Sequence, residues 1–218
     1  MIKAVLFDMD GVMFDTERLA SQSMAEARKQ MNLIFDDDVF QKMRGRNGKD
    51  CVRIMEESLP DKEVCERFFS TSSTIREDFI KKNGTPVKEG LEEMLAYLEK
   101  RKIRKAVVTS SKRDTVDFYF QHCKFPLHFD VMVCGMEIPR GKPFPDAYLI
   151  AAQKLAMRVN ECIVLEDSLN GIKAANKAGC RVVMIPDMDP PTAEAKNACS
   201  RICTDLKETI AYFEENNE

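Results

Sequence analysis

The chain opens with MIKAVLFDMDGVMFDTE (residues 1–17), in which an apolar run stops at two aspartates, Asp8 and Asp10, with Gly11 directly after them. A short run rich in Val, Leu and Phe that ends in polar residues and glycine is typical of a buried strand. Two carboxylates so close together at the end of such a strand repel each other unless a cation offsets their charge. The stretch therefore predicts a strand that carries an acidic, cation-requiring site at its carboxyl end.

More apolar runs of similar length follow, and helical patterns separate most of them. The runs lie at 103–109, 130–135, 162–167, 181–185 and 201–204. Helical spacing of i, i+3, i+4 and i+7 joins Leu91, Met94, Leu95 and Leu98. Further helices are expected to begin at Pro145, with Tyr148, Leu149, Ala152 and Leu155 on one face, and at the caps Ser168 and Thr204. Strands alternating with helices predict an α/β fold, a Rossmann-like doubly wound parallel sheet.

One stretch, residues 17–83, interrupts this alternation and contains no convincing strand. Its two apolar stripes have helical spacing, and they comprise Ala20, Met24, Ala27 and Met31, and Val64, Phe68, Ile75 and Phe79. Gly84 and Pro86 mark the return to the α/β pattern. The sequence therefore predicts a core of residues 1–16 and 84–218, with a small all-helical domain of residues 17–83 inserted after the first strand.

The composition limits which binding partners and which cellular compartment are expected. The chain has 218 residues, of which 44% are hydrophobic and 32% charged, with a net charge of −3, so neither nucleic acid nor an anionic membrane is expected as a partner. No apolar run approaches the ~20 residues of a membrane span, and Lys3 and Asp8 interrupt the N-terminal apolar stretch, which argues against a signal peptide. The eight cysteines form no CxxC pair and are expected to be reduced. We therefore expect a cytoplasmic protein, a monomer, with a small-molecule partner.

Four of the predicted strands are followed by carboxylate, hydroxyl or lysine side chains. They are Asp8 and Asp10 after the first strand, Thr109, Ser110 and Ser111 after the second, Lys142 in GKPFPD (141–146) after the third, and Glu166 and Asp167 after the fourth. Ligands bind beyond the carboxyl ends of parallel strands, so these side chains are expected to converge. The carboxylates form an all-oxygen set that suits Mg²⁺, while Lys142 and the hydroxyls of Thr109 and Ser110 suit a phosphate group. One aspartate could act as nucleophile in phosphoryl transfer, with the second as acid and base.

This set of motifs resembles the haloacid dehalogenase (HAD) superfamily. DMDGVMFDTE (8–17), VVTSS (107–111), GKPFPD and VLEDSLNGIKAANKAG (164–179) look like its four motifs in the family order. The resemblance implies Asp8 as nucleophile, Asp10 as general acid/base, and Thr109 and Lys142 as phosphate-binding residues. It also implies that Asp8, the backbone carbonyl of Asp10 and Asp167 hold Mg²⁺, with Glu166 as a further candidate.

The helical insert looks like the cap of the β-phosphoglucomutase-like, small-cap subgroup. Within it, MRGRNGKD (43–50) carries Arg44, Arg46 and Lys49 beside glycines. One interpretation is a solvated loop between helices. The other is a substrate-specificity loop whose cations attract a phosphorylated substrate, and the sequence leaves both open.

The function favoured by the sequence is hydrolysis of a small phosphorylated metabolite, a sugar or nucleoside monophosphate, by a Mg²⁺-dependent phosphatase. Asp10 favours phosphate-ester or phosphomutase chemistry, because family members that are dehalogenases or phosphonatases lack this carboxylate. The nearest alternative is a hexose phosphomutase of the β-phosphoglucomutase type, which carries a histidine where this chain has Ala20. A phosphorelay receiver domain would be shorter and lack the insert, and a binding protein on an inactive scaffold would have lost motif residues.

Overall fold

Across residues 2–43 and 48–216, which the computed structural model describes, six strands form one parallel sheet around β1 (Ala4–Phe7). The strand order is β3-β2-β1-β4-β5-β6, and each neighbouring pair is parallel. The other strands are β2 (Arg104–Val108), β3 (Val131–Val133), β4 (Cys162–Glu166), β5 (Arg181–Met184) and β6 (Arg201–Ile202). Every strand lies within a run predicted from the sequence, and the Rossmann-like parallel sheet is confirmed.

The chain separates into two compact units. The core unit comprises Met1–Asp15 and Thr85–Glu218, and the helical unit comprises Thr16–Gly84. These boundaries lie one residue from those expected from the sequence. In the core unit, the backbone N–H of Asp15 donates to the Pro86 carbonyl (3.0 Å), and that of Lys88 donates to the Met13 carbonyl (2.9 Å). The segments by which the chain leaves and re-enters the core unit therefore lie side by side.

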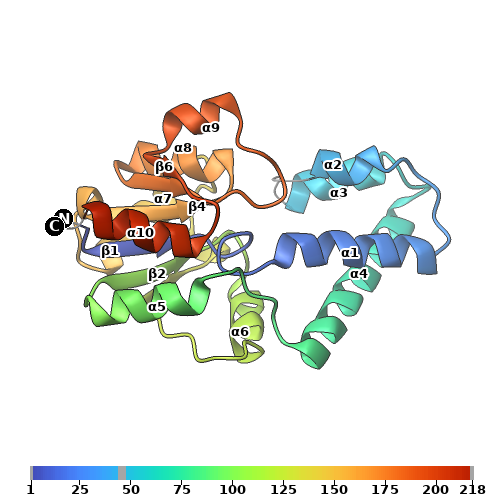
Figure 1. Cartoon of the computed structure of the whole chain (residues 1–218). Helices are drawn as coiled ribbons and strands as arrows, with labels where there is room; N and C mark the ends of the chain where they lie inside the picture. The colour runs from blue at the N-terminus through green and yellow to red at the C-terminus, as the bar shows by residue number, and fades with distance from the viewer. Residues whose placement is uncertain (1, 44–47, 217–218) are drawn as a thin grey trace. The chain divides into compact units, whose positions relative to one another are not determined.

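Helices cover both faces of the sheet (Figure 1). They are α5 (Leu91–Lys100), α6 (Arg113–Gln121), α7 (Asp146–Lys154), α8 (Leu169–Ala178), α9 (Ala193–Ala198) and α10 (Leu206–Asn216), with 3₁₀ turns η1 (Gly135–Glu137) and η2 (Val159–Glu161). On one face, Leu6 and Val164 pack with small residues such as Ala151 of α7 and Ala175 of α8. On the other, α5 packs against α10 and β2. Alternate residues of each strand face opposite layers, so buried strands in such a sheet are apolar throughout.

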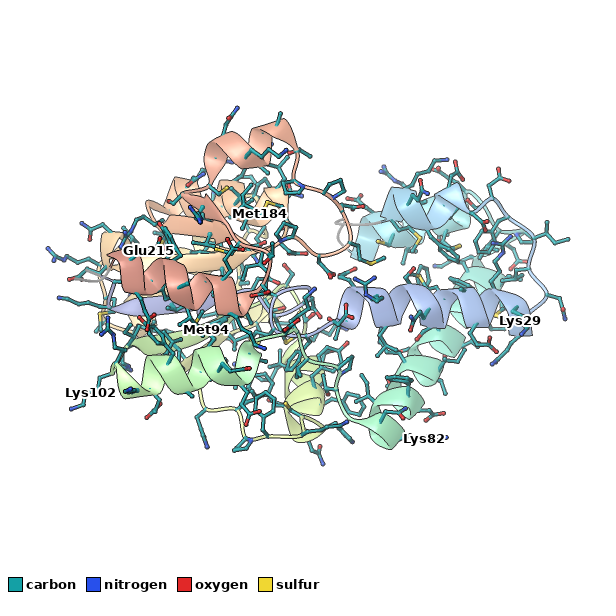
Figure 2. The ribbon with its side chains drawn as sticks, viewed as in Figure 1. Lys29, Lys82, Met94, Lys102, Met184 and Glu215 are labelled. Carbon is teal, nitrogen blue, oxygen red and sulfur yellow. The ribbon has the colours of Figure 1, made fainter. Side chains whose placement is uncertain are left out.

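Two of the residues labelled in Figure 2, Met94 on α5 and Met184 on β5, are buried in the core unit. Met184 belongs to the apolar cluster under α7 and α8. Unbranched methionine side chains fill irregular gaps between packed layers. These residues have a packing role.

The predicted helix caps are confirmed in α8 and corrected in α10. Ser168 Oγ accepts a hydrogen bond from the Gly171 N–H (3.1 Å), and Gly179 ends the helix with φ of +83°. In α10, the side chain that accepts from the helix backbone is Asp205, through the Glu208 N–H (2.8 Å), and the prediction of Thr204 is wrong. The Thr204 hydroxyl instead donates to the Glu208 carboxylate (2.9 Å).

The helical unit is built around a cluster of aromatic side chains. Its helices are α1 (Thr16–Gln30), α2 (Asp38–Met43), α3 (Gly48–Glu56) and α4 (Lys62–Asn83). Helix α1 packs along α4, and Phe35 meets the rings of Phe40 and Phe68 edge-on at 5.4 Å and 5.9 Å between centroids. Phe79 of the predicted stripes lies outside this packing, because it is 42% exposed. Met31 follows the end of α1 but still packs against the cluster.

In the described part of the chain, no helix combines the length and apolar character needed to cross a membrane.

Candidate active site

Lys142 lies between two buried carboxylates at the carboxyl end of the sheet. The Asp8 N–H donates to the Leu165 carbonyl (2.9 Å), which extends the β1–β4 pairing and brings Asp8 beside Glu166. Lys142 Nζ donates to Asp8 Oδ1 and, at 2.5 Å, to Glu166 Oε1. The side chains of Asp8, Lys142 and Glu166 are 11%, 9% and 0% exposed. Three sequence motifs therefore meet in one buried charge cluster.

Glu166 is held by four hydrogen-bond donors. Its Oε1 also accepts from the Tyr148 hydroxyl (2.8 Å), and its Oε2 accepts from the Ser168 N–H (3.0 Å) and hydroxyl (2.9 Å). A Cβ added at Gly171 would overlap the Glu166 carboxylate, so the first turn of α8 approaches this closely only with glycine there. Because these donors occupy both oxygens, the arrangement favours Glu166 as the anchor of Lys142 over the role of metal ligand considered from the sequence.

Burial controls the charges in this cluster. Burial raises the pKa of Asp8 from 3.8 to about 8, the charges of Glu166 and Asp10 act in the same direction, and Lys142 opposes them. Burial would lower the pKa of Lys142, but Asp8 and Glu166 outweigh it and hold that pKa well above 10.5. Burial likewise opposes ionisation of Glu166, yet Lys142 outweighs it and lowers its pKa. Lys142 thus keeps Glu166 ionised but does not offset the effect of burial on Asp8. A further cation beside Asp8 would stabilise its ionised form.

Asp10 contacts the hydroxyls that follow β2. The Ser111 hydroxyl donates to Asp10 Oδ2 at 2.8 Å, and the Thr109 hydroxyl does so at 3.4 Å. The Ser111 N–H also donates to Thr109 Oγ1 (3.0 Å). Ser110, expected to bind phosphate, is exposed, and its carbonyl lies against Gly135. The structure therefore brings Thr109 and Ser111 into contact with Asp10. The sequence analysis placed Ser111 at the strand end but assigned it no role.

Asp167 follows Glu166 and lies against the loop that carries Asp10. Gly11 has φ of +85°, and a Cβ there would lie 2.5 Å from Asp167 Oδ2. Among residues 2–43 and 48–216, no three His, Cys, Asp or Glu side chains are grouped so that they could hold a metal ion. Mg²⁺ needs fewer, because it keeps several waters and takes one or two carboxylates. The carboxylates of Asp8 and Asp167 with the Asp10 carbonyl are an oxygen donor set that fits Mg²⁺.

The predicted residues of the inserted domain are not placed at the site. Arg44 and Arg46 lie outside the described residues, and Lys49 lies in the first turn of α3. The charge cluster and the residues around Asp10 all belong to the core unit.

Tyr148 contacts the charge cluster, but the sequence analysis did not select it, because it was grouped with the apolar face of its helix. Its side chain is fully buried, and burial with the nearby Glu166 charge holds its pKa well above 10.0, so its hydroxyl remains a donor. A tyrosine on an otherwise apolar helix face is itself a signal, because a buried hydroxyl normally has a hydrogen-bond partner.

Comparison with known proteins adds a family and several relatives. A model of haloacid dehalogenase-like hydrolases matches residues 5–185. The "Phosphorylated carbohydrates phosphatase" of Thermotoga maritima is 28% identical over 182 residues, which cover 82% of each chain. The "Probable pseudouridine-5'-phosphatase" of Drosophila melanogaster is 31% identical over 188 residues, 84% of this chain and 80% of that protein. The crystal structure of β-phosphoglucomutase from Clostridium difficile has the same fold, with a TM-score of 0.76, 20% identity and coverage of 99% and 96%.

Proposed function

We propose, since this chain belongs to the haloacid dehalogenase-like hydrolase family, that it is a Mg²⁺-dependent phosphatase of a small phosphorylated metabolite, a sugar or nucleoside monophosphate. The observation that carries the proposal is the separation of its two aspartates into different environments. Asp8 is held by the Lys142 ammonium, whereas Asp10 is held by the hydroxyls of Ser111 and Thr109. A nucleophile and an acid/base need such different surroundings.

In the first step, an oxygen of the Asp8 carboxylate attacks the phosphorus of the ester. The bond from phosphorus to the ester oxygen breaks, and Asp10 transfers its proton to the departing alkoxide, which leaves as the alcohol. Lys142 and the Thr109 hydroxyl hold oxygens of the phosphoryl group during the transfer. The product on the protein is an aspartyl phosphate at Asp8.

In the second step, Asp10, now ionised, takes a proton from a water molecule as its oxygen attacks the phosphorus. The bond between phosphorus and the Asp8 oxygen breaks, which releases inorganic phosphate and restores the Asp8 carboxylate. Asp10 ends the cycle protonated and ready for the next ester. Glu166 holds Lys142 in place throughout.

Mg²⁺ would be held by the carboxylates of Asp8 and Asp167 and by the backbone carbonyl of Asp10. When bound, it supplies positive charge that offsets the repulsion between Asp8 and the phosphate. Glu166 has no place in this set, because Lys142, Tyr148 and Ser168 occupy its oxygens.

Removing the metal is expected to lower turnover of a phosphate ester at least ~100-fold, because the nucleophile and the phosphate are both negative. Turnover is measured after EDTA treatment and gel filtration, then with added Mg²⁺ or Ca²⁺. Mg²⁺ should restore activity and the larger Ca²⁺ should not. Asp167→Asn should require a higher Mg²⁺ concentration for half-maximal rate. Full turnover in the chelated protein would contradict the metal requirement.

The substrate class rests on the inserted unit and on the relatives. Two of the relatives are phosphatases named for phosphorylated carbohydrates and for pseudouridine 5′-phosphate. The cationic segment with Arg44, Arg46 and Lys49 would attract the dianionic substrate. Release of inorganic phosphate from a panel of sugar and nucleoside monophosphates tests this proposal.

A mutase would transfer the phosphoryl group to a sugar hydroxyl instead of to water. Ala20 offers no proton-exchanging ring or hydrogen bond at the position where mutases of this fold carry histidine, so we expect water to reach the aspartyl phosphate. Incubation with β-glucose 1-phosphate and catalytic glucose 1,6-bisphosphate should release at most inorganic phosphate and form little glucose 6-phosphate. Efficient, bisphosphate-dependent isomerisation would identify the chain as a mutase.

A further inference from the structure

Tyr148 joins two parts of the site through one side chain. It lies on α7, two residues past the GKPFPD motif, and is fully buried. Its hydroxyl donates to Glu166 Oε1 at 2.8 Å, and its ring centroid lies 5.2 Å from Lys142 Nζ. The oxygen that accepts from Tyr148 also accepts from Lys142. One carboxylate oxygen is thus shared by a neutral donor and a cationic donor.

This sharing affects where the lysine ammonium lies. Lys142 is drawn toward Glu166 Oε1 on one side and toward Asp8 Oδ1 on the other. The Tyr148 hydroxyl satisfies part of the accepting capacity of Oε1, so it weakens the pull of Glu166 on the ammonium. The electron-rich ring face adds a second, direct attraction for Lys142. Phenylalanine would fill the same space without the first of these effects.

We propose that Tyr148 is a positioning residue that keeps the Lys142 ammonium available to Asp8 and to the substrate phosphate. The inference rests on the proposed phosphatase function and deepens it, because it assigns a role to a residue that contacts neither nucleophile nor phosphate. Without the hydroxyl, Glu166 binds Lys142 more tightly and holds it away from the phosphate. Phosphate binding then weakens although every proposed catalytic group remains.

Tyr148→Phe removes only the hydroxyl, and Tyr97→Phe provides a matched control. Tyr97 lies on α5 in the same unit, and its buried hydroxyl has no hydrogen-bond partner in the described part of the chain. Tyr148→Phe should lower Tm by about 3–12 °C, since one buried hydrogen bond to a charged group is lost. Tyr97→Phe should leave Tm unchanged or raise it.

The functional readouts are KM for a sugar phosphate and the Kd of inorganic phosphate, measured by calorimetry with Mg²⁺ present. Tyr148→Phe should raise both by about 5-fold, the effect of roughly one hydrogen bond, with a smaller change in kcat. Tyr97→Phe should change neither. Tyr148→Leu, which also removes the ring, should weaken phosphate binding further.

The outcomes separate the inference from the proposed function. A lower Tm with unchanged KM and phosphate affinity would make Tyr148 a structural residue and overturn the inference while the phosphatase function stands. Equal Tm values for the two Tyr→Phe variants would also overturn the inference, because they would show that the hydrogen bond from Tyr148 to Glu166 does not stabilise the protein. If the unmodified protein hydrolyses none of the esters but binds phosphate, weaker binding by Tyr148→Phe still supports the positioning role. If it neither hydrolyses esters nor binds phosphate, both proposals fail.

Discussion

Asp8→Asn is expected to reduce phosphatase turnover at least ~10⁴-fold, because no other group can form the aspartyl phosphate. The amide has nearly the same shape as the carboxylate, and its oxygen can still accept from Lys142. The loss should therefore appear in the chemical step while the fold is kept. Steady-state rates and trapping of a phosphorylated protein by mass spectrometry measure the effect.

Two comparisons make this test specific. Asp117→Asn changes the same charge on an exposed position of α6 and should leave turnover unchanged. Asp10→Asn keeps the nucleophile but removes the acid and base, so both half-reactions should slow by roughly 10²–10⁴-fold. Near-normal turnover in Asp8→Asn, or a phosphorylated residue other than Asp8, would contradict the proposed role.

Asp8→Asn should also change the pH dependence of stability in metal-free protein. The pKa of Asp8 is raised from 3.8 to about 8, so the folded state retains a proton that the unfolded state releases. A raised acid pKa contributes stability that is full below about pH 4 and is lost as the pH rises toward about 8. Asparagine has no proton to lose, so the Tm of the variant should rise relative to the unmodified protein between about pH 5 and pH 8 in EDTA. A constant difference over this range would contradict the burial of an ionisable Asp8.

The nearness of Asp8 and Glu166 could be predicted because both lie at the carboxyl ends of parallel strands. Parallel strands present their carboxyl ends at one edge, so residues that follow β1 and β4 must be neighbours there. Apolar runs identified every strand of the sheet, since both faces of a doubly wound sheet are covered and no alternation is needed. Lys142 follows β3, which is not next to β1 or β4 in the sheet, so its position beside Asp8 was predicted from the order of the four motifs.

Details within one turn of chain were harder to predict. In the bend after β2, the hydroxyls of Thr109 and Ser111 both contact Asp10, whereas Ser110 is exposed. Applying the two-residue period beyond the strand end would have selected Ser111. The contact from Tyr148 to Glu166 could not be found this way, because it joins the start of a helix to the far end of the strand that follows, and no periodicity relates the two. It depends on the packing of α7 and on a hydroxyl that helical periodicity treats as part of an apolar face.

The second large effect is expected for Gly171→Ala in the first turn of α8. Alanine has the higher helix propensity, which alone would stabilise the protein by about 1 kcal/mol. The added Cβ, however, would overlap the carboxylate of Glu166, which is fully buried and cannot swing into solvent. Either Glu166 leaves Lys142 or α8 shifts from the sheet. We expect a net loss of about 3 kcal/mol or more in the free energy of unfolding.

Activity should fall with stability in this variant, by at least ~100-fold, because a small displacement of Lys142 removes it from the phosphate. Denaturant unfolding and kcat/KM are the two measurements. Gly141→Ala is the matched control, since a Cβ there meets no atom within 4 Å and should change neither quantity. A neutral Gly171→Ala would mean that α8 does not pack this closely on Glu166.

A second substitution tests the cause of the loss. Glu166→Asp shortens the side chain by one methylene and, by itself, should weaken the hydrogen bonds to Tyr148 and Ser168. In combination with Gly171→Ala, the shorter carboxylate makes room for the new Cβ, so the double variant should lose less stability than the sum of the two single losses. Non-additivity of this kind, in the range of about 0.5–3 kcal/mol, is the signature of residues in direct contact. Simple additivity would place the strain of Gly171→Ala elsewhere, and the anchoring of Lys142 by Glu166 would then not depend on glycine at this position.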